Sequence, residues 1–150
     1  KLNRPAPTDD VPGFIRQHPF GLLIATSDAG EPMAVHVPML LRSAEDGRQT
    51  LVTHVARANP IWRLADETRR WLAVFSGPHA YVSASWYDHE NVSTWNYVAV
   101  HAYGPVRVLS AEETLRALAD VSNQFEHERP GRVAVETYSP GFVAREMRGL

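Results

Sequence analysis

The sequence contains no cysteine and a single lysine, Lys1, and these two scarcities exclude several kinds of chemistry. Without cysteine there is no disulfide, thiolate zinc site, iron–sulfur cluster or cysteine nucleophile. Without an internal lysine there is no Walker-A phosphate loop, Schiff-base lysine or Ser-x-x-Lys hydrolase site. The longest apolar runs are strand-sized, well below the roughly 18 residues of a membrane span, and no secretory apolar region is present. We therefore expect a cytoplasmic protein with no membrane partner.

The net charge and the length of the chain limit which partners it can bind and how many domains it can form. Fifteen Lys and Arg residues against 17 Asp and Glu give a formal net charge of −2, and the arginines are scattered along the chain. No basic stripe able to hold DNA phosphates is visible, so direct DNA binding is doubtful. With 150 residues, 44% of them hydrophobic, the sequence predicts a single domain, 1–150, with one sizeable core.

Short apolar segments separated by turn residues fill the first two thirds of the chain. Asn59–Pro60 and the capping box formed by Ser110 and Glu113 each predict a helix start. We expect strands at 20–26, 32–41 and 50–56, a helix from 60 to about 70, a strand at 72–83 broken at 77–78 and an extended segment at 94–109. We also expect a short turn or helix near 11–17, a helix after 110 and a last short helix from 140 to 149. Antiparallel strands followed by helices predict a mainly β fold, a small antiparallel β-barrel with peripheral helices.

The extended segment at 94–109 indicates that the chain associates with a second subunit. One alternating face carries aromatic residues such as Trp95 and Tyr97, and the other carries Val98 and Val100, so neither face is polar. An antiparallel strand usually has one solvated face, and aromatic residues are enriched in interface cores. We favour a homodimer in which a partner subunit covers one face. The alternative is that the terminal helices cover it.

Seven histidines invite a metal interpretation, which the spacing does not support. No His-Glu-x-x-His motif occurs, although His36, His54 and His101 lie on three different predicted strands and could converge. No Gly-x-Ser-x-Gly motif is present for a serine hydrolase. We interpret the histidines as structural or surface residues and predict no metal site.

The segment 53–60, Thr-His-Val-Ala-Arg-Ala-Asn-Pro, is the strongest candidate for a ligand-binding site in the sequence. It ends a predicted strand, places Arg57 and Asn59 in a turn and leads into a helix start. Exposed N–H groups and the helix dipole favour a phosphate there, and a guanidinium can hold it through two parallel hydrogen bonds. The alternative is an ordinary capped turn without a ligand.

Four segments together resemble the PaiB family, whose members are described as FMN-binding negative transcriptional regulators. They are Pro19-Phe20-Gly21, the run 54–60, the run 75–87 with Phe-Ser-Gly-Pro-His and Ser-Trp-Tyr, and the run 94–104 that begins Thr-Trp-Asn-Tyr. The family is similar to the wider FMN-binding split barrels with the pyridoxamine-phosphate oxidase-like fold. In that fold, two subunits form two flavin sites at their interface.

The resemblance implies roles for the residues near the predicted turn. Arg57 and Asn59 would hold the phosphate and ribityl chain of FMN, with Thr53 and His54 alongside. No catalytic acid or base is implied, since flavin chemistry can proceed on the cofactor itself.

The resemblance also implies where the flavin ring would lie. His36, Val37 and Pro38 would run beside the isoalloxazine edge and offer backbone groups to it. Trp95 and Asn96 would approach from the partner subunit. Family members continue beyond a segment like 145–150 into another strand, so we expect the barrel formed by this sequence to lack a C-terminal strand.

The function expected on these grounds is an FMN-binding homodimer of the PaiB-like transcriptional regulator family. The alternative is an FMN-dependent oxidoreductase of the same fold, which turnover of the bound flavin would distinguish. Direct sequence-specific DNA binding ranks below both, because the helix after Ser110 carries mostly acidic residues. Haem binding through a histidine, as in related split barrels, stays open.

Overall fold

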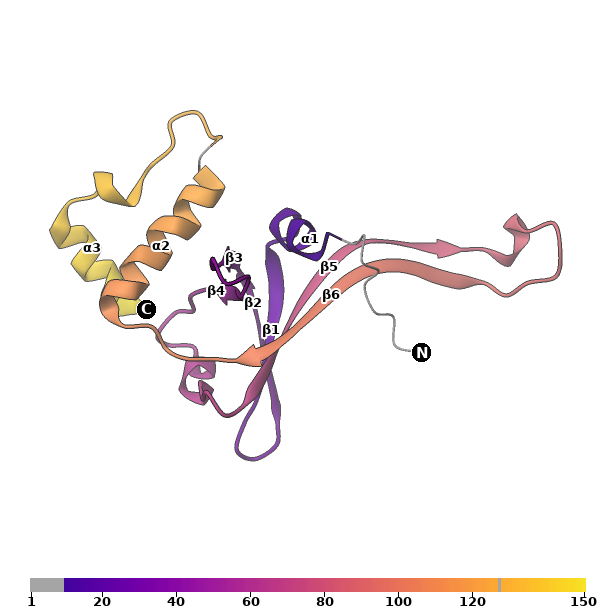
Figure 1. Cartoon of the computed structure of the whole chain (residues 1–150), viewed down its shortest axis with the longest axis horizontal. Coiled ribbons are helices and arrows are strands. Elements are labelled where there is room, and N and C mark those ends of the chain that lie inside the picture. Colours follow the sequence, from indigo (N-terminus) through magenta and orange to yellow (C-terminus); the bar gives the residue numbers. More distant parts are fainter. Residues whose placement is uncertain (1–9, 127) are drawn as a thin grey trace.

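The computed structural model describes residues 10–126 and 128–150, so the polar start of the chain lies outside the described residues. Figure 1 shows the elements in sequence colours. The helices and strands are α1 (Val11–Gln17), β1 (Phe20–Thr26), β2 (Pro32–Pro38), β3 (Leu40–Ser43), β4 (Gln49–Val52), β5 (Arg70–Val82), β6 (Thr94–Pro105), α2 (Ala111–Glu126) and α3 (Pro140–Glu146). Short 3-10 helices are η1 (Pro60–Leu64), η2 (Ala84–Trp86), η3 (Val135–Thr137) and η4 (Met147–Gly149).

The strands form two antiparallel sheets. Four strands are ordered β2-β1-β5-β6, and β3 pairs with β4 in a separate hairpin. The predicted antiparallel order and the late helices are confirmed. Among the described residues, however, no strand pairing joins the four-stranded sheet to the two-stranded one. The chain therefore has antiparallel sheets flanked by helices, and backbone pairing within one chain does not close the expected barrel.

The hydrophobic core lies between β1, β2, β5 and the short helices. Alternate residues of β5 face inward, and Phe75 is fully buried. Ile15 of α1 and Ile61 of η1 close the core from two sides. Burying one such side chain contributes about 1.5–3 kcal/mol, so these alternating positions fix which face of the sheet points inward.

The hairpin of β5 and β6 extends far beyond the rest of the molecule (Figure 1). The two strands pair from Arg70↔Pro105 to Val82↔Thr94, with a register irregularity between Ser76 and His79. Its outer half carries large side chains left exposed by the single chain: Tyr81, Trp86, Tyr87, Val92, Trp95, Tyr97 and Val98. Exposed apolar patches of this kind mark interaction surfaces in folded proteins.

The helices α2 and α3 lie at the end of the molecule opposite the hairpin tip (Figure 1). The predicted capping box is present: the Ser110 N–H donates to Glu113 Oε2 at 2.9 Å, and the Glu113 N–H donates to Ser110 Oγ at 3.2 Å. An ion pair between Arg42 of β3 and Asp120 links the two-stranded sheet to α2. This pair marks where α2 lies beside β3.

Two predicted elements are shorter than expected. The helix predicted from 60 to about 70 is only the 3-10 helix η1, which ends at Leu64. Asp66 explains the end, because its Oδ1 accepts hydrogen bonds from both the N–H and the hydroxyl of Thr68 at 2.7 Å. A side chain that bonds nearby backbone in this way competes with helix continuation. The third strand, expected at 50–56, stops at Val52 as β4.

Two predicted strands are divided differently. The segment 32–41 forms two strands, because its first part, β2, pairs with β1 and its last part, β3, pairs with β4. In contrast, Gly77–Pro78 does not interrupt β5; it is accommodated by the register irregularity. The extended segment predicted to reach 109 ends as β6 at Pro105.

Gly21 provides a test of the core packing. A Cβ at this position would lie 2.8 Å from the backbone oxygen of Val74 and 2.8 Å from Met39 Cε. Because the carbonyl belongs to β5, which pairs with β1, it has little room to move. We expect Gly21→Ala to lower the free energy of unfolding by about 1–3 kcal/mol in urea denaturation. Gly104→Ala, where a Cβ meets nothing within 4 Å, is the control and should have little effect. Equal losses would contradict this packing.

Candidate functional site

A cleft of about 360 Å³ lies between the segment after β4, η1, the link from β6 to α2, and α2 itself. Three of the predicted site residues, Thr53, His54 and Arg57, line it. Most of the remaining wall is apolar, and the aromatic rings of Trp62 and Trp71 belong to it. A largely apolar cleft with a few polar groups is the usual form of a small-molecule site.

Thr53 and His54 stand at the start of the site. The Thr53 hydroxyl donates to the backbone oxygen of Pro38 at 2.7 Å, which ties the segment after β4 to the end of β2. His54 Nδ1 is buried and has no hydrogen-bond partner within the described part of the chain. Burial also lowers the pKa of His54, so its imidazole is neutral at physiological pH. A buried polar atom left unpaired costs about 1–3 kcal/mol.

Arg57 lies in a turn that is fixed from two sides. Its backbone N–H donates to Gly149 O at 2.7 Å, and its carbonyl accepts from Trp62 Nε1 at 3.0 Å. Its guanidinium forms no hydrogen bond or ion pair within residues 10–126 and 128–150. The turn therefore presents an exposed cation at the rim of the cleft, with all its donors available to an anion.

Asn59 caps the short helix that follows. Its side-chain oxygen accepts from the Ile61 N–H at 3.0 Å, as predicted for a helix start. The residue lies two positions beyond Arg57 but does not line the cleft. Its predicted contact with a ligand stays a prediction, and the capping alternative for this residue has direct support.

The residues predicted beside the flavin ring lie on β2, outside the cleft lining. Val37 is buried in the core, whereas His36 is exposed and its ring stacks on Phe20 with centroids 5.9 Å apart. Pro38 is connected to the cleft through its backbone oxygen, which accepts from Thr53. The structure thus joins the end of this segment to the site through one hydrogen bond.

Trp95 and Asn96 lie on the outer half of the hairpin. They pair with Tyr81 and Ala80, and the Trp95 ring also lies 6.0 Å from that of His79. Neither residue lines the cleft of its own chain. Their predicted approach from a partner subunit remains a prediction that one chain does not test.

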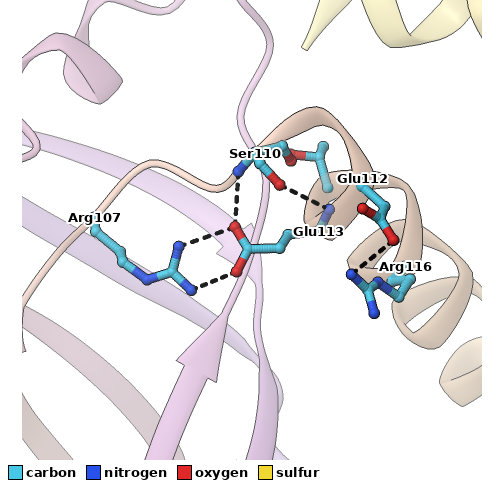
Figure 2. A network of polar contacts seen from close by, with 6 residues as sticks. Arg107, Ser110, Glu112, Glu113 and Arg116 are labelled. Carbon is cyan, nitrogen blue, oxygen red and sulfur yellow. Dashed lines mark hydrogen bonds and ion pairs between the residues drawn. The ribbon is translucent and has the colours of Figure 1, made fainter.

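The sequence did not indicate that Arg107 belongs to the cleft. Its guanidinium binds both carboxylate oxygens of Glu113, at 3.0 Å and 2.7 Å, beside the capping box at the start of α2 (Figure 2). This contact with Arg107, supported by the Ser110 N–H, lowers the pKa of Glu113 from its ordinary 4.5 to about 2. The capping pattern predicted Glu113, but no local pattern connects it with an arginine six residues earlier.

The histidines do not form a metal centre in the described part of the chain. No three His, Cys, Asp or Glu residues within it are grouped so as to hold a metal ion. The possible convergence of His36, His54 and His101 is therefore not observed. Within the same residues, no helix has both the length and the apolar character to cross a membrane.

Comparison with known proteins identifies the family. The model of the family described as "Putative FMN-binding domain" matches residues 4–150. The chain belongs to this family of FMN-binding domains. It is 34% identical over 142 residues to the protease synthase and sporulation protein PAI 2 of Bacillus subtilis, covering 95% of this chain and 68% of that protein. The resemblance to the PaiB family is thereby confirmed.

Two fungal proteins belong to the same group of relatives. An uncharacterized protein of Saccharomyces cerevisiae is 29% identical over 104 residues, which cover 65% of this chain and 62% of that protein. An uncharacterized protein of Emericella nidulans is 28% identical over 153 residues, which cover 77% and 59%. The chain thus spans only about three fifths of the length of these two fungal proteins.

The Arg107–Glu113 contact predicts a pH dependence of stability. Because the pKa of Glu113 falls on folding, its contribution to stability is complete above about pH 4.5 and is lost as the pH falls toward 2. We expect wild type to be more stable than Glu113→Gln at pH 6, with the difference disappearing near pH 2 in chemical denaturation.

The matched control for this measurement is Glu112→Gln. Glu112 forms an exposed ion pair with Arg116 at 3.1 Å, and exposed pairs contribute little to stability. This variant should differ from wild type by a small amount that is similar at both pH values. A Glu113→Gln difference that persists unchanged at pH 2 would contradict the assignment.

Proposed function

We propose that this chain forms a homodimer that binds FMN, with the flavin held between the cleft of one subunit and the hairpin of its partner. The observation that carries the proposal is the convergence of Thr53, His54 and the unpaired Arg57 on one largely apolar cleft. Membership of the FMN-binding domain family supports the choice of ligand. Membership of the same family supports a split barrel, which we propose is completed at the subunit interface.

The chemistry of the cleft suits an FMN phosphate. A dianionic phosphate needs cationic donors, and the Arg57 guanidinium is free to form two parallel hydrogen bonds with it. Arg107, in contrast, is already neutralised by Glu113 at 2.7 Å. The Thr53 hydroxyl donates to Pro38 O and can still accept a hydrogen bond from a ribityl hydroxyl. Asn59, two residues after Arg57, would also contact the ribityl chain. Apolar walls with Trp62 and Trp71 suit a flat ring system.

The hairpin supplies the other half of the proposed site. Its outer half exposes the large side chains of Trp86 and Tyr97, each 71% accessible in the single chain. Covering this surface with a second subunit would remove apolar side chains from water, which is favourable through the hydrophobic effect. Trp95 and Asn96 would then reach the partner's flavin, near the edge of its segment His36, Val37 and Pro38.

Bound FMN would supply hydride or single-electron transfer. The residues of this chain would hold the phosphate, exclude water with apolar walls and leave the ring accessible at the interface. A regulatory role, as in the PaiB-like transcriptional regulators, is the biological context that we propose. The surface of α2, which carries Glu112, Glu113, Asp120 and Glu126 against Arg116, has the wrong charge for direct contact with DNA phosphates.

Substitution of Arg57 tests the phosphate site. We expect Arg57→Ala to weaken FMN binding by about 10- to 100-fold, the loss typical of charge-assisted hydrogen bonds, in a flavin-fluorescence titration. Riboflavin, which lacks the phosphate, should bind both proteins with similar affinity. Arg48→Ala, which removes an exposed arginine in the turn between β3 and β4, is the control and should leave FMN binding unchanged. Equal affinities of wild type for FMN and riboflavin would contradict the phosphate site.

Substitution in the hairpin tests the interface. We expect wild type to sediment as a dimer at micromolar concentrations and Tyr97→Asp to sediment as a monomer, because a charge would be buried in the interface. Tyr97→Asp should also bind FMN more weakly, because a monomer has no partner hairpin to contact the flavin. Val133→Asp changes a partly exposed apolar residue outside the hairpin and should leave the dimer intact. A monomeric wild type that binds FMN normally would overturn the shared site.

A further inference from the structure

Arg57 lies in a tight turn whose central peptide is bonded to the side chain of Trp62. The Asn59 N–H closes the turn by donating to Ala56 O at 2.8 Å, so Arg57 is one of the two central residues of a β-turn. The carbonyl of Arg57 belongs to the peptide between these central residues and takes no part in the closing bond. It accepts instead from the indole N–H of Trp62, with Nε1 at 3.0 Å.

The position of Trp62 follows from how η1 begins. Asn59 caps this short helix and Pro60 is its first residue, so Trp62 lies in its first turn, five residues after Arg57. The indole ring also forms part of the cleft wall. The guanidinium of Arg63 lies over this ring, 5.6 Å from its centroid, and such a cation–π contact is favourable. Trp62 therefore contacts both the cleft and the turn from a ring that is itself held in place.

The backbone of Arg57 is fixed on both sides. Its N–H donates to Gly149 O at 2.7 Å, and its carbonyl accepts from Trp62. A guanidinium that binds a phosphate through two parallel hydrogen bonds must be held in one orientation, and ordering a long side chain costs conformational entropy. A backbone fixed before the ligand arrives reduces the ordering that binding requires. Of the two bonds, only that from Trp62 is made by a side chain and can be removed by substitution.

We infer that Trp62 is a positioning residue for the phosphate of the ligand: its N–H holds the Arg57 carbonyl and thereby sets the preference of the cleft for phosphorylated over unphosphorylated flavin. The inference rests on the proposed FMN site, because it concerns the selectivity of that site. It gives Trp62 two separable contacts. The ring contributes to the wall that FMN and riboflavin share, and the N–H acts through Arg57 on the phosphate alone.

The ratio of the riboflavin Kd to the FMN Kd tests the inference, in flavin-fluorescence titrations. Trp62→Phe keeps an aromatic ring in the cleft and beside Arg63 but removes the N–H. We expect it to lower this ratio about three- to tenfold, the effect of losing one hydrogen bond. The smaller ring should weaken the binding of both flavins alike, so this loss cancels in the ratio. Riboflavin binding by the variant also shows that it is folded.

Trp71→Phe is the matched control. Trp71 lines the same cleft from β5, so the substitution also takes an indole out of the wall. It leaves the hydrogen bond between Trp62 and Arg57 in place. This variant should bind both flavins more weakly with the same ratio as wild type. An equal fall of the ratio in the two variants would mean that any indole of the wall has this effect, and would overturn the inference.

A double variant separates positioning from direct contact with the phosphate. If Trp62 acts through Arg57, then Arg57→Ala and Arg57→Ala/Trp62→Phe should have the same ratio, because the two effects are not additive. A lower ratio in the double variant would show that Trp62 acts on the phosphate independently and would overturn the inference.

The titrations also distinguish failure of this inference from failure of the proposed function. A wild type that prefers FMN, with a ratio that Trp62→Phe leaves unchanged, would refute only the role of Trp62. A wild type with equal affinity for the two flavins would refute the proposed phosphate site and, with it, the role of Trp62.

Discussion

The antiparallel pairing of β5 with β6 organises the rest of the structure. Over its inner half, β5 also pairs with β1 and buries Trp71, Ala73 and Phe75, so the core forms against this strand. Over its outer half the same hairpin leaves the core and carries exposed aromatic residues into solvent. One continuous pair of strands therefore supports the fold and presents the surface that we propose as the subunit interface (Figure 1). The proposed flavin site depends on both halves.

Much of the fold followed from local rules in the sequence. A short apolar segment bounded by turn residues predicted β1, and side-chain caps predicted the starts of η1 and α2, each of which is present. The predictions failed where a distant or competing contact decided the outcome. The predicted strand 32–41 divides because its two parts pair with different strands, β1 and β4, and Asp66 stops a predicted helix by binding Thr68. The expected barrel is not closed by strand pairing within the described residues, because the four-stranded and two-stranded sheets do not pair with each other.

The candidate site was predictable only in part. The composition of the turn after β4 indicated an anion site, and the structure brings Thr53, His54 and Arg57 to one cleft. The sequence could not show that Arg57 has no acidic partner among residues 10–126 and 128–150, or that Arg107 has one in Glu113, because pairing depends on how β6 leads into α2. The sequence also could not show that His54 Nδ1 is buried and has no partner within the described residues, since its burial depends on how α2 and α3 pack around it.

The proposed flavin site depends most on the turn that carries Arg57, which would hold the phosphate of a flavin shared by two subunits. A crystal structure of the protein grown with FMN tests this directly. We expect phosphate density within hydrogen-bond distance of the Arg57 guanidinium and a flavin ring lying against Trp95 of a second subunit. Flavin density elsewhere on the molecule, or within a single subunit with Arg57 directed to solvent, would contradict it.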